Sequence, residues 1–407
     1  MAGRRNRIPE LDGLRVLMIF VVSWYHIWQQ SWLHPWIRID FLGIEYSLDW
    51  LVRSGYIWVD GTVLLSVFLL FLPWAEAKRN RTPNPDTREF YWRRARRVIP
   101  GYWFVVLLHL FAVALPWNLY NHNAPLLVKD LVTHLTFTFT QFDDTYLMTN
   151  LGGGAWTLAI LVQGYVLFPF IAQCAQKRPA ATMCSLALVC FAFRAWCLWG
   201  LTDYRMVVNQ LINFLDVYAL GILLATVFPG LHEQCAKQAG KPKLLRETAA
   251  TLLFIACLWG LVRMLKIQSM TGDQLQKYQM MYRPVFALCF GGMILTAPFV
   301  LLPLRKLLGN PVTRFLGVVS MNYYLVHQTV AVHLKRLNIP PAVSALPNQA
   351  GEQPWQTRYT WISFGASLVL AILITYLVEK PGGKLMDRFH TWRQTKTAPA
   401  VPEPSGD

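Results

Sequence analysis

Arg15 and His26 are the first residues whose types and spacing suggest chemistry. They stand eleven positions apart in an apolar segment, residues 8–28, that opens with Glu10 and Asp12. Because an α-helix turns about 100° per residue, this step returns to within roughly 20° of the same face and rises about 16 Å. One helix face would then carry a guanidinium group near the membrane edge and an imidazole near mid-membrane. An ionisable group inside a membrane is costly, so it is by default a functional candidate.

His26 is a candidate general base, because imidazole titrates near neutral pH and accepts a proton from a hydroxyl group. The alternative is a histidine that only hydrogen-bonds two helices together. Asp60 lies about five residues inside the second expected span, at a depth similar to that of His26. A carboxylate there would orient and charge-stabilise the imidazole, and the alternative is an unrelated structural hydrogen bond. We predict a catalytic pair with His26 as the base and Asp60 as its orienter.

A cluster of four arginines, in the FYWRRARRVIPGYWF of residues 90–104, stands at the expected cytoplasmic mouth of the third span. Three of them share a helix face by their i,i+3 and i,i+4 spacing, whereas Arg96 is better explained as a topology signal. Guanidinium groups bind phosphate through two parallel hydrogen bonds. We expect a site for donor phosphates that shares one cavity with His26. Its predicted members are Arg15, Arg93, Arg94 and Arg97.

Other polar side chains in the apolar segments are better explained as contacts between helices. His327, in the SMNYYLVHQTV of residues 320–330, is more simply structural than catalytic. The seven cysteines show no paired spacing, so neither a disulfide framework nor a metal site is predicted. The remaining candidates for such helix-bridging contacts are Ser66, Trp156, Gln163, Arg194, Asn213 and Asp216.

The elements that must position these residues are membrane-spanning helices. The chain has 407 residues, of which 54% are hydrophobic and only 15% are charged, and this composition is not that of a soluble protein. Its apolar runs recur at about the 20 residues that a helix needs to cross a bilayer. We predict an all-α, polytopic bundle of about ten transmembrane helices, multi-pass in the cell membrane. The expected spans are residues 14–33, 55–75, 98–117, 154–173, 180–200, 208–229, 248–266, 284–304, 314–334 and 360–379.

The net charge of +16 is concentrated in a few loops. This pattern indicates membrane topology and phosphate contacts rather than nucleic-acid binding. Short loops rich in Lys and Arg face the cytoplasm, and the alternation of such loops fits ten spans with both termini cytoplasmic. The loop at 264–283, with Lys266, Lys277 and Arg283, fits this alternation least well.

We expect one membrane domain over residues 1–390 and a disordered cytoplasmic tail over residues 391–407, because the end of the chain is short and Pro-rich. The outer loop at 118–153 is long for a simple connection. It contains an amphiphilic piece at 126–140 and leads into three glycines at 152–154, so we expect it to dip back into the membrane.

Seven short motifs, taken in order, resemble the acyltransferase 3 family of integral-membrane acyltransferases, and together they cover about residues 8–385. They are LDGLR at 11–15 with His26, VD at 59–60 with LSVFL at 65–69, the set Phe90, Arg93, Arg94, Arg97, Pro100 and Tyr102, WTL at 156–158 with Tyr165 and Pro169, ALGILLA at 219–225, YLVH at 324–327, and EKP at 379–381.

The resemblance implies an enzyme that moves an acyl group, usually acetyl, from a cytoplasmic CoA thioester to a hydroxyl group of a surface glycan or another exported molecule. It implies no bound cofactor, with acetyl-CoA or another acyl-CoA as the donor substrate. The implied partners are this donor, a glycan or lipid-linked saccharide acceptor and membrane lipids, without nucleic acid.

Three positions depart from the family pattern. Leu161 stands where the family commonly has glutamate, Val67 replaces the glycine of LSGFL, and Met321 replaces the tyrosine of an SY motif. Loss of the glutamate fits either altered acceptor handling or reduced catalytic competence.

Two other classes of function are compatible with the sequence. Ten spans with buried polar groups also suit a transporter or flippase that catalyses nothing, although we find no matching pair of Gly/Pro-broken helices in two related halves. A membrane sensor or assembly partner with a degenerate acyltransferase fold is the other alternative. Dependence of acyl transfer on His26 would separate the enzyme from both.

Overall fold

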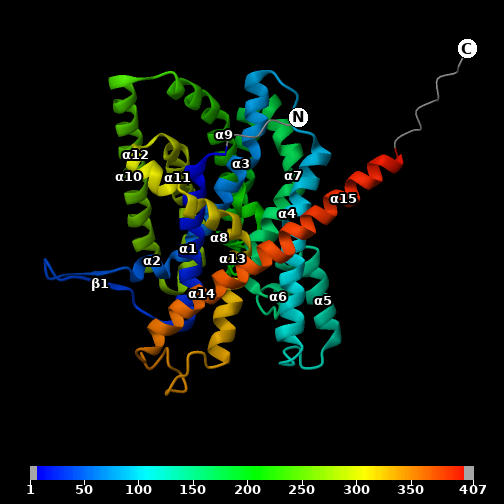
Figure 1. The fold of residues 1–407 in the computed structure, drawn as a ribbon, viewed down its shortest axis with the longest axis vertical. Helices are drawn as coiled ribbons and strands as arrows, with labels where there is room; N and C mark the ends of the chain where they lie inside the picture. Colours follow the sequence, from blue (N-terminus) through cyan, green and yellow to red (C-terminus); the bar gives the residue numbers. More distant parts are fainter. Residues whose placement is uncertain (1–6, 398–407) are drawn as a thin grey trace, which may run out of the picture.

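A computed structural model describes residues 7–397 and shows a bundle of long helices (Figure 1). Within these residues, nine helical segments are long and apolar enough to cross a membrane, which confirms the prediction of an all-α, multi-pass membrane protein. The long helices are α1 (Pro9–Ser31), α3 (Trp58–Asn80), α4 (Thr87–His109), α7 (Trp156–Lys177), α8 (Pro179–Gly200), α9 (Leu215–Ala236), α10 (Gly240–Ser269), α11 (Leu275–Thr296), α13 (Pro311–Arg336), α14 (Trp355–Ile374) and α15 (Lys380–Thr397).

The remaining elements are short and connect these helices. Two strands form an antiparallel hairpin, and several long helices are extended by single turns of 3-10 or π helix. The short elements are β1 (Trp36–Ile39), β2 (Ile44–Ser47), α2 (Asp49–Arg53), η1 (Gly55–Ile57), η2 (Leu110–Ala114), α5 (Ala124–Leu135), η3 (Phe139–Gln141), α6 (Asp143–Tyr146), η4 (Gly153–Ala155), η5 (Leu211–Phe214), η6 (Gly272–Gln274), η7 (Ala297–Phe299), α12 (Leu302–Leu308) and η8 (Thr375–Glu379).

Helix α13 corresponds to the expected span at 314–334, and it is not among those nine segments. Its 26 residues are long enough to cross a bilayer. It is less apolar than the nine segments because it carries polar side chains such as Asn322, His327 and Gln328. It packs along both α1 and α14, so these polar groups lie among protein helices rather than in lipid.

Helix α3 is the centre of the bundle and packs against α1, α7, α9 and α11. Helices in lipid gain little from burying apolar surface, so their association depends on close packing at small residues. Gly221 of α9 is such a site, since a Cβ atom there would lie 2.8 Å from Cγ1 of Val67. Val67, which replaces the glycine of the resembled family, therefore has room because the partner helix carries the glycine instead.

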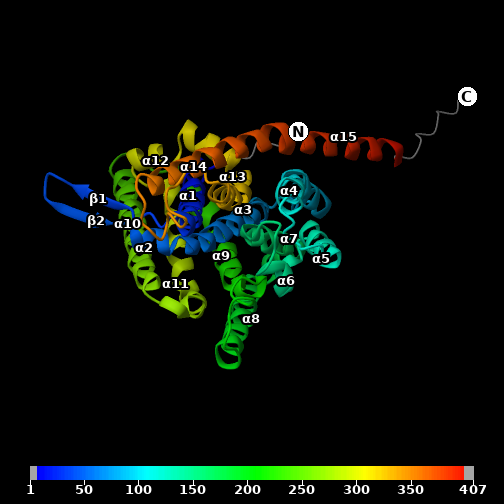
Figure 2. The ribbon, with the colours of Figure 1, turned by 90° about the horizontal axis from the view of Figure 1, so that it is seen from below.

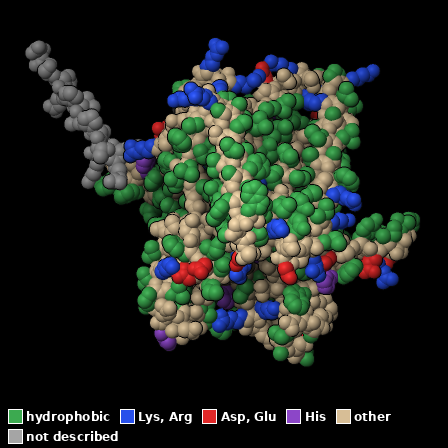
Figure 3. All heavy atoms as spheres, turned by 180° about the vertical axis from the view of Figure 1, so that it is seen from behind, with side chains coloured by type: hydrophobic (Ala, Val, Ile, Leu, Met, Phe, Trp, Pro, Cys, Tyr) green, Lys and Arg blue, Asp and Glu red, His purple; other side chains and the backbone are tan. Residues whose placement is uncertain are grey.

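Basic side chains gather at one end of the bundle, which we name the basic end. Lys78 Nζ donates to the carbonyl oxygen of Gln176 at 2.6 Å, and Arg305 pairs with Glu247 at 3.3 Å. These contacts bring together the ends of α3, α7, α10 and α12. Figure 3 shows Lys and Arg side chains along the upper edge, a broad apolar surface beneath it, and mixed acidic and basic side chains lower down.

The opposite end of the bundle carries the connections that we expected on the outside. The β1–β2 hairpin extends sideways from the bundle there (Figure 1). The segment at 118–153 folds on itself around the buried carboxylate of Asp130, which accepts from the Tyr120 hydroxyl at 2.7 Å and from Thr149 at 3.0 Å. It contains α5 and α6 in place of a simple loop, and its depth in a membrane stays a prediction.

The peripheral helices are clear when the bundle is seen from the opposite end (Figure 2), where α8 and α10 lie outside the central group around α1 and α3. Helix α15 runs along α4 and continues to Thr397. Residues 391–397 of the expected disordered tail are therefore helical, and the rest of that tail, residues 398–407, lies outside the described residues. The division into one membrane domain and a tail stays a prediction.

Candidate functional site

A cavity of about 220 Å³ lies among α1, α3, α4, α7 and α13, and we name it the inner cavity. Three of the four predicted arginines line it, namely Arg15, Arg94 and Arg97. A second cavity of about 490 Å³, the mouth cavity, shares Arg15 and Arg97 with it and reaches Arg7 and Lys380. Two guanidinium groups therefore stand where a path from the basic end enters the bundle.

The inner cavity is positively charged. Its described lining contains three arginines and no carboxylate. Arg15 is only weakly compensated, since its Nη1 lies 3.8 Å from Asp12, whose carboxylate is held more closely by Arg7 at 2.6 Å. Leu161, at the position where the resembled family has glutamate, also lines this cavity. The replacement therefore leaves the cavity more positive, and such a site favours phosphate groups.

The periodicity of α4 decides which arginines reach the inner cavity. The helix starts where the Asp86 side chain accepts from the amide of Glu89 at 2.7 Å, a standard N-cap. Arg94 and Arg97 are three residues apart and therefore share a face. Arg96 points elsewhere and pairs with Asp387 of α15 at 2.6 Å, so it joins two helices.

Arg93 does not join the other three arginines. Its Nε lies 3.6 Å from Glu89, one turn earlier on α4, and the side chain lines a separate surface cavity beside the end of α3. Of the four arginines predicted to bind donor phosphates, the structure brings Arg15, Arg94 and Arg97 to one cavity and leaves Arg93 outside it, and their role stays a prediction. The face of α4 that we predicted covers a wide angle around the helix. Only Arg94 and Arg97 on this face point toward the cavity beside α1.

His26 lies in the outer part of α1, five residues before the helix ends at Ser31, and its depth in a membrane stays a prediction. Its Nδ1 lies 3.0 Å from Oε1 of Gln29, while the Gln29 amide nitrogen donates to the Tyr25 hydroxyl at 2.9 Å. Because this leaves the amide oxygen facing the ring, Nδ1 carries the hydrogen and Nε2 carries the lone pair. The Nε2 atom has no hydrogen-bond partner among the described residues, as a general base requires.

Two rings separate His26 from the inner cavity. The ring of His327 is buried, and its centroid lies 5.2 Å from that of His26 and 5.6 Å from that of Tyr324. Tyr324 lines the inner cavity, and its hydroxyl donates to Thr157 at 2.7 Å. His26 is not among the residues that line the cavity. The expectation that the imidazole and the arginines share one cavity is therefore wrong, because a layer of two rings lies between His26 and the inner cavity.

His327 itself is held by the backbone. Its Nδ1 donates to the carbonyl oxygen of Tyr323 at 3.2 Å, and its Nε2 is buried without a partner among the described residues. A buried ring nitrogen without a partner is uncommon and costs free energy. The structural role that we preferred for His327 accounts for the hydrogen bond of Nδ1. It does not account for Nε2, which has no partner in the described part of the chain beside the rings of His26 and Tyr324.

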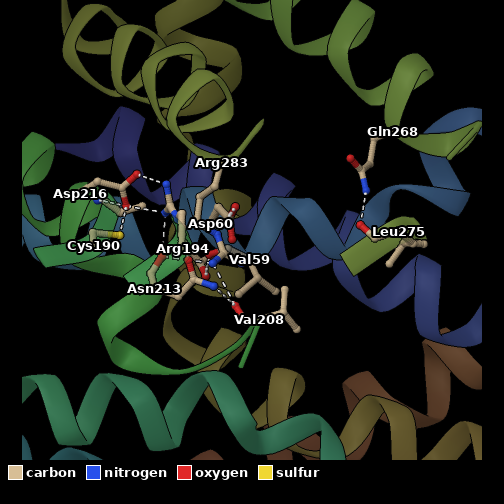
Figure 4. A network of polar contacts seen from close by, with 12 residues as sticks. Val59, Asp60, Cys190, Arg194, Val208, Asn213, Asp216, Gln268, Leu275 and Arg283 are labelled. Atoms are coloured by element: carbon tan, nitrogen blue, oxygen red, sulfur yellow. Dashed lines mark hydrogen bonds and ion pairs between the residues drawn. The ribbon is translucent and has the colours of Figure 1, made fainter. Parts of the chain in front are cut away.

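Asp60 does not orient His26. Its Oδ2 accepts from Nε of Arg283 at 3.1 Å, and both side chains are fully buried (Figure 4). Helix α11 begins at Leu275, earlier than the expected start of that span at residue 284, so Arg283 lies inside the bundle opposite Asp60. A guanidinium group is always charged, and it neutralises a buried carboxylate more completely than a neutral imidazole does.

Two residues of the site were missed from the sequence. We counted Arg283 as a loop charge, although α11 begins at Leu275 and contains both Arg283 and Pro284. Gln29 was not considered, although its i+3 spacing from His26 places the two side chains on one helix face. Among the described residues, no group of three or more His, Cys, Asp or Glu side chains is arranged to hold a metal ion.

Sequence comparisons give matches over the whole bundle and over part of it. A family described as an acyltransferase domain matches residues 8–380. The peptidoglycan O-acetyltransferase OatA of Listeria monocytogenes is 25% identical over 170 residues, which cover 40% of this chain and 24% of that protein. The O-acetyltransferase OatA of Staphylococcus aureus is 27% identical over 174 residues, again 40% of this chain and 24% of that protein. The matches thus span about a quarter of these relatives, and no solved structure gives a significant match.

Proposed function

Because this chain belongs to the acyltransferase 3 family, we propose that it transfers an acyl group, acetyl in the first instance, from acyl-CoA to a hydroxyl group of a glycan. The observation that carries the proposal is the course of α1. This helix presents Arg15 to a cationic cavity at the basic end and His26, with an unpaired Nε2 among the described residues, near the opposite end. The rise between the two residues is about 16 Å.

The arginines of the inner cavity would bind the donor. Acyl-CoA carries several phosphate charges, and guanidinium groups recognise phosphate with paired hydrogen bonds. Arg97 lines both the inner cavity and the mouth cavity, so it stands on the route that a donor would take from the basic end. Loops rich in Lys and Arg face the cytoplasm, and we therefore assign the basic end to that side.

His26 would act as general base for the acceptor. Its Nε2 takes the proton of the acceptor hydroxyl as the oxygen attacks the thioester carbonyl carbon. The new C–O bond forms, the C–S bond breaks, and the CoA thiolate leaves. The proton then passes from the imidazolium to the thiolate, which restores the neutral base. Gln29 keeps the hydrogen on Nδ1 throughout, because its amide oxygen can only accept.

The proposal requires movement in the ring layer. Tyr324 and His327 stand between the inner cavity and His26, so an acyl arm held by the arginines reaches the base only when these rings turn aside. The acceptor class follows from the relatives, one of which is named for action on peptidoglycan, so we propose a glycan hydroxyl.

The proposal is tested with the full chain in lipid nanodiscs, labelled acetyl-CoA and a tetrasaccharide of N-acetylglucosamine as acceptor. His26→Ala should lower acetyl transfer by about 10²- to 10⁴-fold, the usual contribution of a general base. His122→Ala is the matched control, because His122 is an exposed histidine of an outer connection. Transfer by His26→Ala at the rate of the control would overturn the base assignment.

The donor site is tested with a second matched pair. Arg97→Ala should raise the KM for acetyl-CoA by about 10-fold or more, because a hydrogen bond to a charged group contributes about 1.5–3 kcal/mol. Arg88→Ala removes an exposed arginine of the same helix that lines neither cavity. Equal KM values in the two variants would remove the donor role of the inner cavity. If acetyl transfer persists in every variant, the assignment of the active site to these residues is wrong. The same result would show that the protein is an enzyme and not a non-catalytic transporter.

A further inference from the structure

A pocket of about 850 Å³ opens at the end of the bundle opposite the basic end, and we name it the outer pocket. Tyr25 of α1 lines it together with residues 201–205, between α8 and α9, and residues 272–277, which form η6 and the start of α11. We propose that the outer pocket binds an uncharged oligosaccharide segment of the acceptor. This assignment rests on the proposed function for the chemical class of its ligand.

The outer pocket is connected to His26 by hydrogen bonds. Tyr25 directly precedes His26, and the two ring centroids are 5.0 Å apart. The amide of Gln29 joins them, since it donates to the Tyr25 hydroxyl at 2.9 Å and accepts from Nδ1 of His26 at 3.0 Å. A ligand that rests on Tyr25 is therefore beside the base, on the side of the ring layer that lies away from the inner cavity.

One wall of the pocket is fastened by buried ion pairs (Figure 4). Arg283, paired with Asp60, donates through Nη1 to the carbonyl oxygen of Val208 at 2.9 Å. Arg194 pairs with Asp216 at 2.8 Å and donates to the side chain of Asn213 at 2.6 Å. The Asn213 amide nitrogen donates in turn to the carbonyl oxygen of Val208 at 3.2 Å. Both ion pairs thus hold the segment that follows residues 201–205.

The other wall is fastened in a similar way. Gln268, buried at the end of α10, donates through Nε2 to the carbonyl oxygen of Leu275 at 2.9 Å and to the Tyr56 hydroxyl at 2.7 Å. Charged and amide groups are costly to bury in a membrane protein, and they commonly mark functional positions. Here they fix both walls before a ligand arrives, and a preformed pocket loses less conformational entropy on binding.

The lining of the pocket suits a hydroxyl-rich ligand without net charge. It contains two acidic and two basic side chains, and the exposed carboxylate of Asp203 is already engaged by Arg205 at 2.7 Å. The side chains of Gln274 and Gln276 form no hydrogen bond within the described residues and offer donors and acceptors together. The pocket's volume lies within the range of about 300–1,000 Å³ that is typical of ligand sites. The inner cavity differs, because its three arginines make it positively charged and suit it to an anionic ligand.

The test measures equilibrium binding of a labelled N-acetylglucosamine tetrasaccharide to the full chain in nanodiscs, with a tetrasaccharide of galacturonate as the anionic comparison. Gln276→Ala and Tyr204→Ala should each weaken binding of the uncharged sugar by about 10-fold, which corresponds to about 1.4 kcal/mol. Gln349→Ala is the matched control, because Gln349 is an exposed glutamine of an outer connection that does not line the pocket.

Arg97→Ala separates this proposal from the proposed function. It should bind the uncharged sugar as the wild type does, while its use of acetyl-CoA is impaired. The pocket assignment is overturned by undetectable binding at millimolar sugar, by equal affinity in Gln276→Ala and Gln349→Ala, or by tighter binding of the galacturonate comparison. A third outcome is possible, in which sugar binding depends on Gln276 but acetyl transfer does not depend on His26. That result would support the outer pocket as a sugar site and contradict the proposed catalytic function.

Discussion

The ion pair between Asp60 and Arg283 gives the sharpest test of how the buried charges are used. Both side chains are fully buried, and the N···O distance is 3.1 Å. Removing one partner of such a pair costs about 3–5 kcal/mol, because the other charge stays buried without compensation. Asp60→Asn should therefore lower the free energy of unfolding by about that amount. Asp144→Asn breaks the exposed pair of Asp144 with Lys129 and should cost no more than about 1 kcal/mol.

The double variant, Asp60→Asn with Arg283→Met, distinguishes an ion pair from a catalytic carboxylate. Because the double variant removes both charges, no uncompensated charge is left buried in the bundle. The two substitutions should therefore be non-additive, with a coupling energy of about 2–3 kcal/mol. Arg283→Met alone also loses the hydrogen bond to the Val208 carbonyl oxygen. This loss occurs in the Arg283→Met variant and in the double variant, so it cancels when the coupling energy is calculated from the double-mutant cycle.

The assay follows unfolding in mixed micelles as SDS is titrated, together with acetyl transfer per folded molecule. If Asp60 oriented His26, Asp60→Asn would lose turnover by up to about 10⁴-fold, as replacement of an orienting aspartate does elsewhere, and the double variant would not recover it. Our reasoning is refuted by a coupling energy below about 0.5 kcal/mol together with such a loss per folded molecule.

Three single contacts can be tested by substitution. Gln29→Ala should lower kcat by about 2- to 13-fold, the equivalent of one hydrogen bond of about 0.5–1.5 kcal/mol, without changing the KM for acetyl-CoA; a loss as large as that of His26→Ala would contradict the positioning role. Gly13→Ala should destabilise the protein by about 1–3 kcal/mol in the SDS titration, because its Cβ would overlap a backbone oxygen of α12, whereas Gly365→Ala, with nothing within 4 Å, should be neutral. Tyr324→Ala should raise hydrolysis of acetyl-CoA relative to transfer, while Tyr324→Phe keeps the ring and the wild-type ratio; equal ratios in both variants would contradict a separating role.

The helices were predictable because apolar length is a property of local sequence. Nine spans follow from hydropathy, and α13 was found although its polar side chains lower its apolar character. The boundary of α11 was wrong because Arg283 interrupts the apolar run, and a charged residue at the edge of such a run is normally assigned to a loop. Its burial depends on partners from elsewhere in the chain, namely Asp60 on another helix and the Val208 carbonyl oxygen.

The positions of the candidate residues along their helices were predictable, and their partners were not. Arg15 and Arg97 were placed at one membrane surface from spacing and charge, and the structure brings them to one cavity. Asp60 and Arg283 are 223 residues apart, and their pairing depends on how α3 and α11 are rotated about their axes. Periodicity fixes which residues share a face, but it does not fix which neighbour that face meets.

The rings of Tyr324 and His327 lie between the arginines of the inner cavity and His26. A protein that accepts a charged donor on one side of a membrane and a glycan on the other must keep water and ions from following the acyl group. A continuous cavity from Arg97 to His26 would be such a path, since its polar lining would hold water. The rings of Tyr324 and His327 stand on this path, and the hydrogen bond from the Tyr324 hydroxyl to Thr157 holds the first ring in place. Under the proposed function, a closed ring layer is therefore what transfer across a sealed bilayer requires, and it needs to open only while the acyl arm passes.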